Sequence, residues 1–411
     1  MTRRCAKCET EYPNEIAFCG ADGSVTIAVT PPGEEPDPRL GLQLGDYIIV
    51  AHVADGAMGA VYEARNATTR ERVAIKILHA DVAEDEVALE RFNREYETAG
   101  MFDHPHIVKV IDFGETGDGS RFMTMEYLVG RELGDLLRTE GKQSPARALR
   151  LLAQVADALE HAHSFGVIHR DLKPDNIYLC KTDGGDDVRL LDFGSVKLQV
   201  ETGPKLTAFG TTLGSPYYMS PEQAKGLPDV DTRTDVFAIG AILYEALTGK
   251  IAFDAPTVAE ILMKIVKQKP APMVSIDPGL PPAIDAVVER ALAKDKKQRF
   301  DTPVALVDAA LAAFGVPGTA AEWAAKPQAA LEAAIYAATA SAATEPAPMQ
   351  VPQQPEAPRV AHPRPAVATR PATVSAAPPP PSAAAPVLIV AGLAAVAFLV
   401  ASGIAAFFFL T

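Results

Sequence analysis

The spacing of hydrophobic residues changes along the chain. Short apolar runs at residues 46–53 and 72–78 have the length and β-branched content of strands. Later segments at 146–166 and 235–249 repeat apolar residues every three or four positions, and this spacing predicts helices. Strands followed by helices predict an α+β fold with a small β-rich lobe, a large helical lobe and a ligand site in the cleft between them.

The C-terminal part of the chain has a different pattern. Ala and Pro dominate residues 316–385, apart from a helix-permissive patch at 320–338, so we expect a disordered linker there. Residues 387–410 form an uncharged apolar run long enough to cross a bilayer as a helix, with a buried core helix as the alternative. No apolar run opens the chain as a secretory signal would. We therefore expect a single-pass protein of the cytoplasmic membrane with its body in the cytoplasm.

The charge balance narrows the range of partners. The chain has 38 basic and 52 acidic residues, a formal net charge of −14. This excess of acidic groups argues against a nucleic-acid partner, so any anionic ligand must meet locally placed positive groups.

Three of the four cysteines lie close to the N-terminus. Cys5 and Cys8 form a CxxC pair and Cys19 follows, a spacing like that of half a zinc ribbon. A closed zinc site needs four ligands, so Asp22, water or His52 would have to complete it. The alternative is a reduced, disordered tail.

A glycine-rich segment separates two predicted strands. In VADGAMGAVYEA, Gly56 and Gly59 would let backbone N–H groups approach phosphate oxygens, although two nearby glycines are also common in ordinary hairpins. The next strand carries Lys76 among apolar residues, where an ammonium needs either a partner or a route to solvent. Glu90 or Glu95 on the following helical segment could be that partner.

Two further segments, VIHRDLKPDNIYL and VRLLDFGSVKL, place polar residues between apolar runs. Asp171 can accept the proton of an attacking hydroxyl, and Lys173 can neutralise charge on a transferred phosphate. Asn176 and Asp192 carry oxygen donors suited to Mg²⁺. Each residue alone could be a cap or a turn residue, but together they predict phosphoryl transfer.

These motifs resemble the protein kinase superfamily, specifically the eukaryotic-type (Hanks-type) serine/threonine kinases of bacteria. GAMGAV, VAIK, HRDLKPDN, DFG and SPE occur in the family's order, and the resemblance covers residues 46–314. It implies the bilobal kinase fold, ATP as the phosphate donor, Mg²⁺ (with Mn²⁺ as an alternative) as the metal, and Ser or Thr hydroxyls of proteins as acceptors.

The resemblance also implies roles for single residues. Lys76 would hold the α- and β-phosphates and pair with Glu95. Asp171 would be the catalytic base, with Lys173 beside it, and Met125 would be the gatekeeper. The metal ligands would be Asn176 and Asp192. The residues expected around the nucleotide are Val53, Ala54, Gly56, Gly59, Val61, Lys76, Glu126 and Leu128, and residues 126–128 would be the hinge that hydrogen-bonds adenine.

Some positions look structural, and two depart from the family pattern. Asp235 resembles the residue that anchors the catalytic loop from below, and Glu222 with Arg299 resembles a buried ion pair. Ala54 replaces the first glycine of the phosphate loop, for which we expect a modest effect on nucleotide affinity. Ser215 replaces a substrate-facing threonine and keeps its hydroxyl.

Regulation is expected in the loop before SPE, which carries Thr207, Thr211 and Thr212. A phosphothreonine there could be bound by Arg170, and family position favours Thr211. We expect autophosphorylation in trans, favoured by tethering in one membrane; the alternative is that these hydroxyls only solvate the loop.

Two other functions fit the motifs less well. The intact set of motif residues argues against a pseudokinase scaffold, and a small-molecule phosphotransferase would leave SPEQ and Asp235 unexplained. The expected organisation is a zinc-ribbon-like segment at 1–35, a kinase domain at 46–314, a linker at 316–385 and a transmembrane helix at 387–410.

Overall fold

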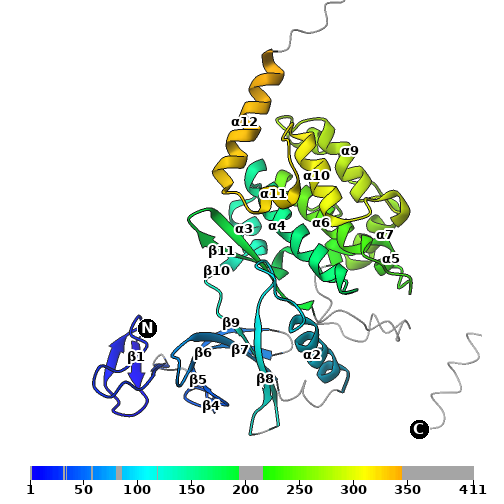
Figure 1. Ribbon diagram of the computed structural model, residues 1–411. Coiled ribbons are helices and arrows are strands. Elements are labelled where there is room, and N and C mark those ends of the chain that lie inside the picture. Colours follow the sequence, from blue (N-terminus) through cyan, green and yellow to red (C-terminus); the bar gives the residue numbers. More distant parts are fainter. Residues whose placement is uncertain are drawn as a thin grey trace, which may run out of the picture. The chain divides into compact units, whose positions relative to one another are not determined.

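The computed structural model describes residues 2–30, 33, 35–56, 59–79, 86–117, 119–193 and 216–344 (Figure 1). The expected phosphorylation sites Thr207, Thr211 and Thr212, the substrate-facing Ser215 and the predicted span at 387–410 lie outside these ranges. Within them, no helix is both long enough and apolar enough to cross a membrane.

The N-terminal residues form a small antiparallel sheet in the order β2-β1-β3. Its strands are β1 (Thr2–Cys5), β2 (Glu11–Pro13) and β3 (Thr26–Ala28). The central strand alternates as an extended chain must, because Arg3 and Cys5 are buried whereas Arg4 is exposed. The same face of β1 therefore carries one charged residue and one cysteine inward.

The next sheet has six antiparallel strands in the order β4-β5-β6-β7-β9-β8. They are β4 (Gln43–Leu44), β5 (Tyr47–Asp55), β6 (Gly59–Asn66), β7 (Arg72–Leu78), β8 (Val110–Glu115) and β9 (Arg121–Glu126). Ile49, Ile75 and Phe122 are buried together on one face. Helix α2 (Glu86–Ala99) places Phe92 against Leu78 of β7. This packing fixes the helix beside the strand that carries Lys76.

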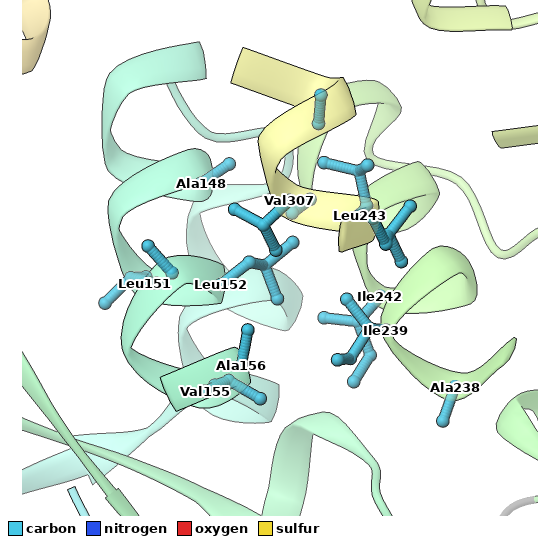
Figure 2. Close-up of a cluster of buried hydrophobic side chains, with 14 of the residues drawn as sticks. Ala148, Leu151, Leu152, Val155, Ala156, Ala238, Ile239, Ile242, Leu243 and Val307 are labelled. Carbon is cyan, nitrogen blue, oxygen red and sulfur yellow. The ribbon is translucent and has the colours of Figure 1, made fainter. Parts of the chain in front are cut away.

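The larger of the two lobes is mainly helical. Its helices are α3 (Leu133–Glu140), α4 (Pro145–Ser164), α5 (Pro221–Ala224), α6 (Arg233–Thr248), α7 (Val258–Lys267), α8 (Met273–Ile276), α9 (Ala283–Ala291) and α10 (Pro303–Ala313). Figure 2 shows the core where α4, α6 and α10 meet, with Leu152, Ile239 and Val307 among its fully buried side chains. The two-lobed α+β fold predicted from the sequence is thereby confirmed, including the helices expected at 146–166 and 235–249.

A small sheet connects the helical part to the catalytic residues. Strands β10 (Gly130–Glu132), β11 (Ile177–Thr182) and β12 (Gly185–Leu190) pair in that order. The backbone of β12 also bonds the segment between α2 and β8, since Leu190 N donates to His106 O at 2.8 Å and Leu190 O accepts from Val108 N at 3.0 Å. These bonds join the two lobes next to the residues that follow Leu190.

The structure differs from the linker expected at 316–385. Helices α11 (Ala320–Ala324) and α12 (Gln328–Thr344) occupy part of it, and α11 packs on α4. Trp323 is buried and its ring nitrogen donates to Pro317 O at 2.9 Å. Alanine is the strongest helix former, and one large aromatic side chain gives α11 enough apolar surface to dock. Val316 is also part of the core of the helical lobe, so the linker prediction is wrong for residues 316–344, and residues 345–385 lie outside the described part of the chain.

Candidate active site

An ion-pair cluster joins β7, α2 and the segment after β12. Lys76 Nζ lies 2.8 Å from Glu95 Oε1 and 3.3 Å from Asp192 Oδ1. Lys76 points toward α2 and away from the sheet core, because Ile75 and Ile77 on either side of it pack into that core and successive residues of a strand face opposite sides. Of the two carboxylates left open by the sequence, Glu95 is therefore the partner of Lys76, as the kinase resemblance implied. The side chain of Glu90 is outside the described atoms.

The surroundings keep Lys76 and Asp192 charged. Burial by itself lowers the pKa of Lys76, but the carboxylates of Asp192 and Glu95 raise it above its ordinary value. The Lys76 ammonium in turn holds the pKa of Asp192 below its usual range, against the effect of burial. Burial raises the pKa of Glu95. At neutral pH the cluster thus presents an ammonium for phosphate oxygens and a carboxylate for a cation.

The catalytic loop brings together the other expected polar side chains. Lys173 Nζ lies 3.0 Å from Asp171 Oδ2. Asn176 ends a single 3₁₀ turn, Pro174–Asn176, and its amide donates to Asp171 O at 2.7 Å. Its own main-chain oxygen accepts from Leu191 N at 3.0 Å, which places Asn176 beside the segment carrying Asp192. The loop thus holds a base, a cation and oxygen donors in one place.

A buried carboxylate holds this loop from the helical side. Asp235, at the start of α6, accepts hydrogen bonds from the backbone N–H groups of His169 and Arg170, both at 3.0 Å, and from His163 Nε2 at 2.8 Å. Arg170 has the left-handed value φ 65°, which is strained for a residue other than glycine. Asp235 therefore stabilises a backbone shape that aims Asp171 outward, as its expected anchoring role requires. Sequence reasoning missed the contributions of His163 and of Gln223, whose amide donates to Arg170 O at 2.6 Å.

The phosphate loop is a tight connection between β5 and β6. Gly56 N donates to Gly59 O at 2.9 Å, while Ala54 pairs with Val61 across the two strands. A Cβ on Gly59 would lie 2.2 Å from Ile77 O, so this glycine is required by strand packing. Val53 is exposed, as a residue that covers a ligand would be. Residues 57–58 lie outside the described part.

The segment after β9 corresponds to the expected hinge. Met125 packs beside Leu78 and Phe92, at the position expected for a gatekeeper behind the nucleotide. Glu126 is fixed at both ends, because its N–H donates to Lys109 O and its carboxylate accepts from Lys109 N, each at 2.9 Å. Tyr127 comes next, followed by Leu128, which is half-buried. The main chain here is held in place by contacts that do not use a ligand.

The expected buried ion pair is present. Both guanidinium nitrogens of Arg299 bond the two carboxylate oxygens of Glu222 at 2.7 Å, and Arg299 is among the largest fully buried side chains of the described residues. The pair ties the turn before α10 to α5, next to Gln223 and the catalytic loop.

The N-terminal cysteines also come together. Cys5, Cys8 and Cys19 offer sulfur atoms, and Asp22 a carboxylate oxygen, that all lie within 4.8 Å of one another. His52, one of the alternatives for a fourth ligand, instead pairs with Asp55 at 3.2 Å. Thiolates with a carboxylate are a donor set that Zn²⁺ accepts.

The donor chemistry of the main site fits ATP and Mg²⁺. Asp192 and Asn176 are hard oxygen ligands of the kind that Mg²⁺ prefers, and Lys76 and Lys173 are positive groups for phosphate. A carboxylate next to a lysine, together with oxygen ligands for a metal and positive groups for phosphates, is the set of side chains that a phosphoryl-transfer site needs. The class of protein defined by this site and the two-lobed fold is a nucleotide-dependent phosphotransferase.

Known proteins share this architecture. The protein kinase domain family model matches residues 47–309. The serine/threonine-protein kinase pkn3 of Myxococcus xanthus is 38% identical over 258 residues, which are 62% of this chain and 47% of that protein. The serine/threonine-protein kinase PknB of Mycobacterium tuberculosis is 38% identical over 250 residues, 60% of this chain and 39% of that protein.

A solved structure agrees. The crystal structure of the Mycobacterium tuberculosis PknI kinase domain matches with a TM-score of 0.52 and 29% identity, covering 67% of this chain and 98% of that chain. The chain belongs to the protein kinase family. It spans less than half the length of the two curated relatives described above.

Proposed function

We propose that the protein is a serine/threonine protein kinase that transfers the γ-phosphate of ATP to Ser or Thr hydroxyls of protein substrates. The observation that carries the proposal is the assembled cluster of Lys76, Glu95 and Asp192, with the Lys76–Glu95 contact at 2.8 Å. A scaffold without turnover would not need Lys76 and Glu95, whose side chains are only 16% and 7% exposed, to be held as an ion pair at the cost of their hydration. The names of the relatives, both serine/threonine-protein kinases, support the same acceptor class.

Each of the active-site residues has a separate role in the proposed reaction. Lys76 binds phosphate oxygens and is kept in place by Glu95. Asp171 accepts the proton of the attacking hydroxyl, and Lys173, 3.0 Å from it, offsets charge on the phosphoryl group in transfer. Asn176 and Asp192 would hold Mg²⁺, which when bound neutralises phosphate charge. Positioning and electrostatics therefore supply most of the expected rate acceleration.

The test of catalysis compares the full chain with its Asp171→Asn variant, using labelled ATP, Mg²⁺ and a general protein acceptor. Asp175→Asn is the matched control, because Asp175 lies in the same loop but bonds Arg138 of α3 at 2.9 Å. We expect transfer by the parent and by the control, and none by Asp171→Asn. If Asp171→Asn transferred as much labelled phosphate as the parent, the role of Asp171 as the base would be contradicted. ATP binding without transfer by any of the three forms would favour the scaffold.

We further propose that the kinase autophosphorylates in trans within the loop that carries Thr207, Thr211 and Thr212, with Thr211 as the main site. Arg170 lies beside the catalytic base and supplies a guanidinium that can bind a phosphate. The test mixes an Asp171→Asn chain, as acceptor only, with active kinase and maps the phosphorylated residues. Label on the inactive partner supports transfer in trans, while unchanged activity of Thr211→Ala would contradict the regulatory role.

We also propose that residues 387–410 tether the kinase to the cytoplasmic membrane as a single-pass helix, with the catalytic part in the cytoplasm. The support is the length and the uncharged character of that run. The full chain should sediment with membranes and resist extraction by carbonate, whereas a chain ending at residue 386 should not. A full chain that remains in the supernatant would contradict the tether.

We propose Zn²⁺ as the ion held by Cys5, Cys8 and Cys19. Three thiolates select a soft divalent metal, and a structural zinc site contributes directly to folding. Metal analysis of the purified full chain should find one zinc per chain, and a Cys8→Ser, Cys19→Ser double variant should have none. Absence of zinc from the parent would refute this assignment.

A further inference from the structure

The geometry of the N-terminal cluster identifies its fourth ligand. A tetrahedral zinc ion with the usual bond lengths holds its sulfur ligands about 3.8 Å apart and a sulfur and an oxygen about 3.5 Å apart. Cys8 Sγ and Cys19 Sγ are 3.5 Å apart, and Cys5 Sγ lies 3.5 and 3.6 Å from the two oxygens of Asp22. These two pairs thus already have nearly the spacing of a closed site with three sulfurs and one oxygen, and all four donor atoms lie within 4.8 Å of one another.

Backbone groups are arranged around the sulfurs as well. Cys5 Sγ accepts from Lys7 N at 3.4 Å and from Cys8 N at 3.3 Å, and Cys19 Sγ accepts from Ala21 N at 3.4 Å. Such N–H donors stabilise thiolates that bind a metal. The carboxylate of Asp22 is oriented separately, because its Oδ1 accepts from Ser24 N at 2.9 Å. These contacts orient the sulfur and oxygen donors toward one another, as the surroundings of a metal site do.

The metal ribbon, defined as residues 2–28, is too small to be ordered by its own core. Its three strands have only four, three and three residues, and so short a sheet needs a metal or a partner surface for stability. Cys5 lies two residues after Arg3 on β1, so both side chains project from the same buried face. Fixing Cys5 on a metal therefore also fixes the position of Arg3.

Arg3 connects the metal ribbon to the nucleotide lobe. Its guanidinium donates to Thr26 O of β3 at 3.3 Å and to Glu63 Oε2 of β6 at 3.1 Å. The side chains of Arg3 and Glu63 are only 6% and 4% exposed, so water reaches this ion pair only if the contact between the two segments opens. Phe18 adds a second contact, with its ring centre 4.9 Å from the guanidinium of Arg70.

Glu63 continues the connection toward the hinge. The oxygen that accepts from Arg3 also accepts from Arg72 at 2.9 Å, and the guanidinium of Arg72 lies 3.6 Å from the ring centre of Tyr127. Tyr127 lies between Glu126 and Leu128, the expected adenine-binding residues. Burial alone would raise the pKa of Glu63, but the hydrogen bond from Arg72 and the charges of its arginine partners lower it.

We propose that the metal ribbon is a built-in regulator of nucleotide binding, in which zinc held by Cys5, Cys8, Cys19 and Asp22 fixes Arg3 on Glu63 and thereby holds Arg72 against Tyr127 of the hinge. The inference rests on the zinc site proposed above. When the metal is lost, Arg3 is released, water reaches Glu63, and Arg72 is no longer held on Tyr127. The hinge then has more conformations to lose on binding adenine, and nucleotide affinity falls.

The test uses the full chain and measures two quantities, zinc per chain and the Kd for a fluorescent ATP analogue. Zinc is stripped with a chelator, which is removed before binding is measured in excess Mg²⁺. We expect stripping to weaken nucleotide binding by about fivefold or more, the usual lower range of coupling between two sites, and zinc to restore it. Asp22→Asn should lose zinc to a competing chelator sooner than the parent, whereas Asp22→Cys should retain it.

Two arginine variants separate the connection from the metal site. Arg3→Met should keep one zinc but bind nucleotide as weakly as the stripped parent, and stripping should change it no further. Arg4→Met is the matched control, because Arg4 lies on the opposite, exposed face of β1 and pairs with Glu11. It should behave as the parent does.

The outcomes distinguish the two proposals. A parent without zinc refutes the zinc site and this inference together. A parent with one zinc whose Kd does not change on stripping refutes only the coupling. Normal nucleotide affinity in Arg3→Met, with coupling intact, would show that the path through Arg3 and Glu63 is wrong.

Discussion

Helix α11 offers a direct test of how far the folded domain extends. The family match ends at residue 309, yet Trp323 lies in the core beside α4. Its side chain is 6% exposed, its ring nitrogen donates to Pro317 O, and the ammonium of Lys326 lies 4.1 Å from the ring centre. Trp323→Ala would remove the buried ring, its hydrogen bond and its contact with Lys326, and would leave a cavity against α4.

The size of the effect follows from this burial. Replacing a buried aromatic residue with alanine costs about 3–5 kcal/mol, and the small residual exposure of Trp323 favours the lower end, about 3 kcal/mol. For a domain of more than 150 residues each kcal/mol lowers Tm by roughly 2–4 °C. We therefore expect Trp323→Ala to lower the Tm of the kinase by about 6–12 °C.

The assay is thermal unfolding followed by circular dichroism, with Tyr336→Ala as the matched control. Tyr336 is an aromatic residue of the neighbouring helix α12 that is 79% exposed, so its removal should leave the Tm unchanged. Truncation after residue 315 should destabilise the domain at least as much as Trp323→Ala. A Trp323→Ala chain with the Tm of the parent would refute the docking of α11 and restore the linker interpretation.

Further substitutions test the site and its supports. Lys76→Met should lower kcat/KM by about 100-fold or more in a peptide phosphorylation assay, because the phosphates lose their positive partner; an unchanged kcat/KM would contradict its role. Arg299→Met should lower the free energy of unfolding by about 3–5 kcal/mol, since it leaves Glu222 buried and unpaired; denaturant titration measures this, and a loss below about 1 kcal/mol would contradict it. Burial and the charge of Arg299 lower the pKa of Lys294 to about 7. Between that value and its ordinary pKa the unfolded chain binds more protons, so Tm should rise with pH above 7, and Lys294→Met should reduce this rise.

The active-site residues could be predicted because their chemistry is encoded in short contiguous motifs. Asp171, Lys173 and Asn176 lie within six residues of one another, so their proximity does not depend on knowing the fold. The pairing of Lys76 was different, because the residues alone allowed either Glu90 or Glu95. The choice is set by how α2 packs, with Phe92 buried against β7, and a sequence pattern does not show that rotation.

Helix α11 was missed for a related reason. Its Ala-rich sequence resembles a linker, and its docking depends on polar groups of α4 that look like surface residues. Arg150 Nε donates to Lys326 O at 2.7 Å, and Gln154 is fully buried with its amide on Ala324 O at 3.4 Å. These side chains satisfy carbonyl groups at the end of α11 that would otherwise be buried without partners. Composition alone does not identify such partners, since they lie about 170 residues away.

The backbone at the site shows why geometry adds to what the motifs contain. Arg170 and Asp192 both have left-handed φ values, 65° and 55°, and each such residue costs of order 1 kcal/mol or more. The sequences HRD and DFG do not show that these two residues have strained backbone conformations. The strained conformations persist because groups outside HRD and DFG stabilise them: Asp235 accepts the N–H of Arg170, and the ammonium of Lys76 attracts the carboxylate of Asp192. The backbone next to Asp171 is therefore held by Asp235, which does not take part in the reaction, and a substitution there should alter the reaction without removing any reacting group.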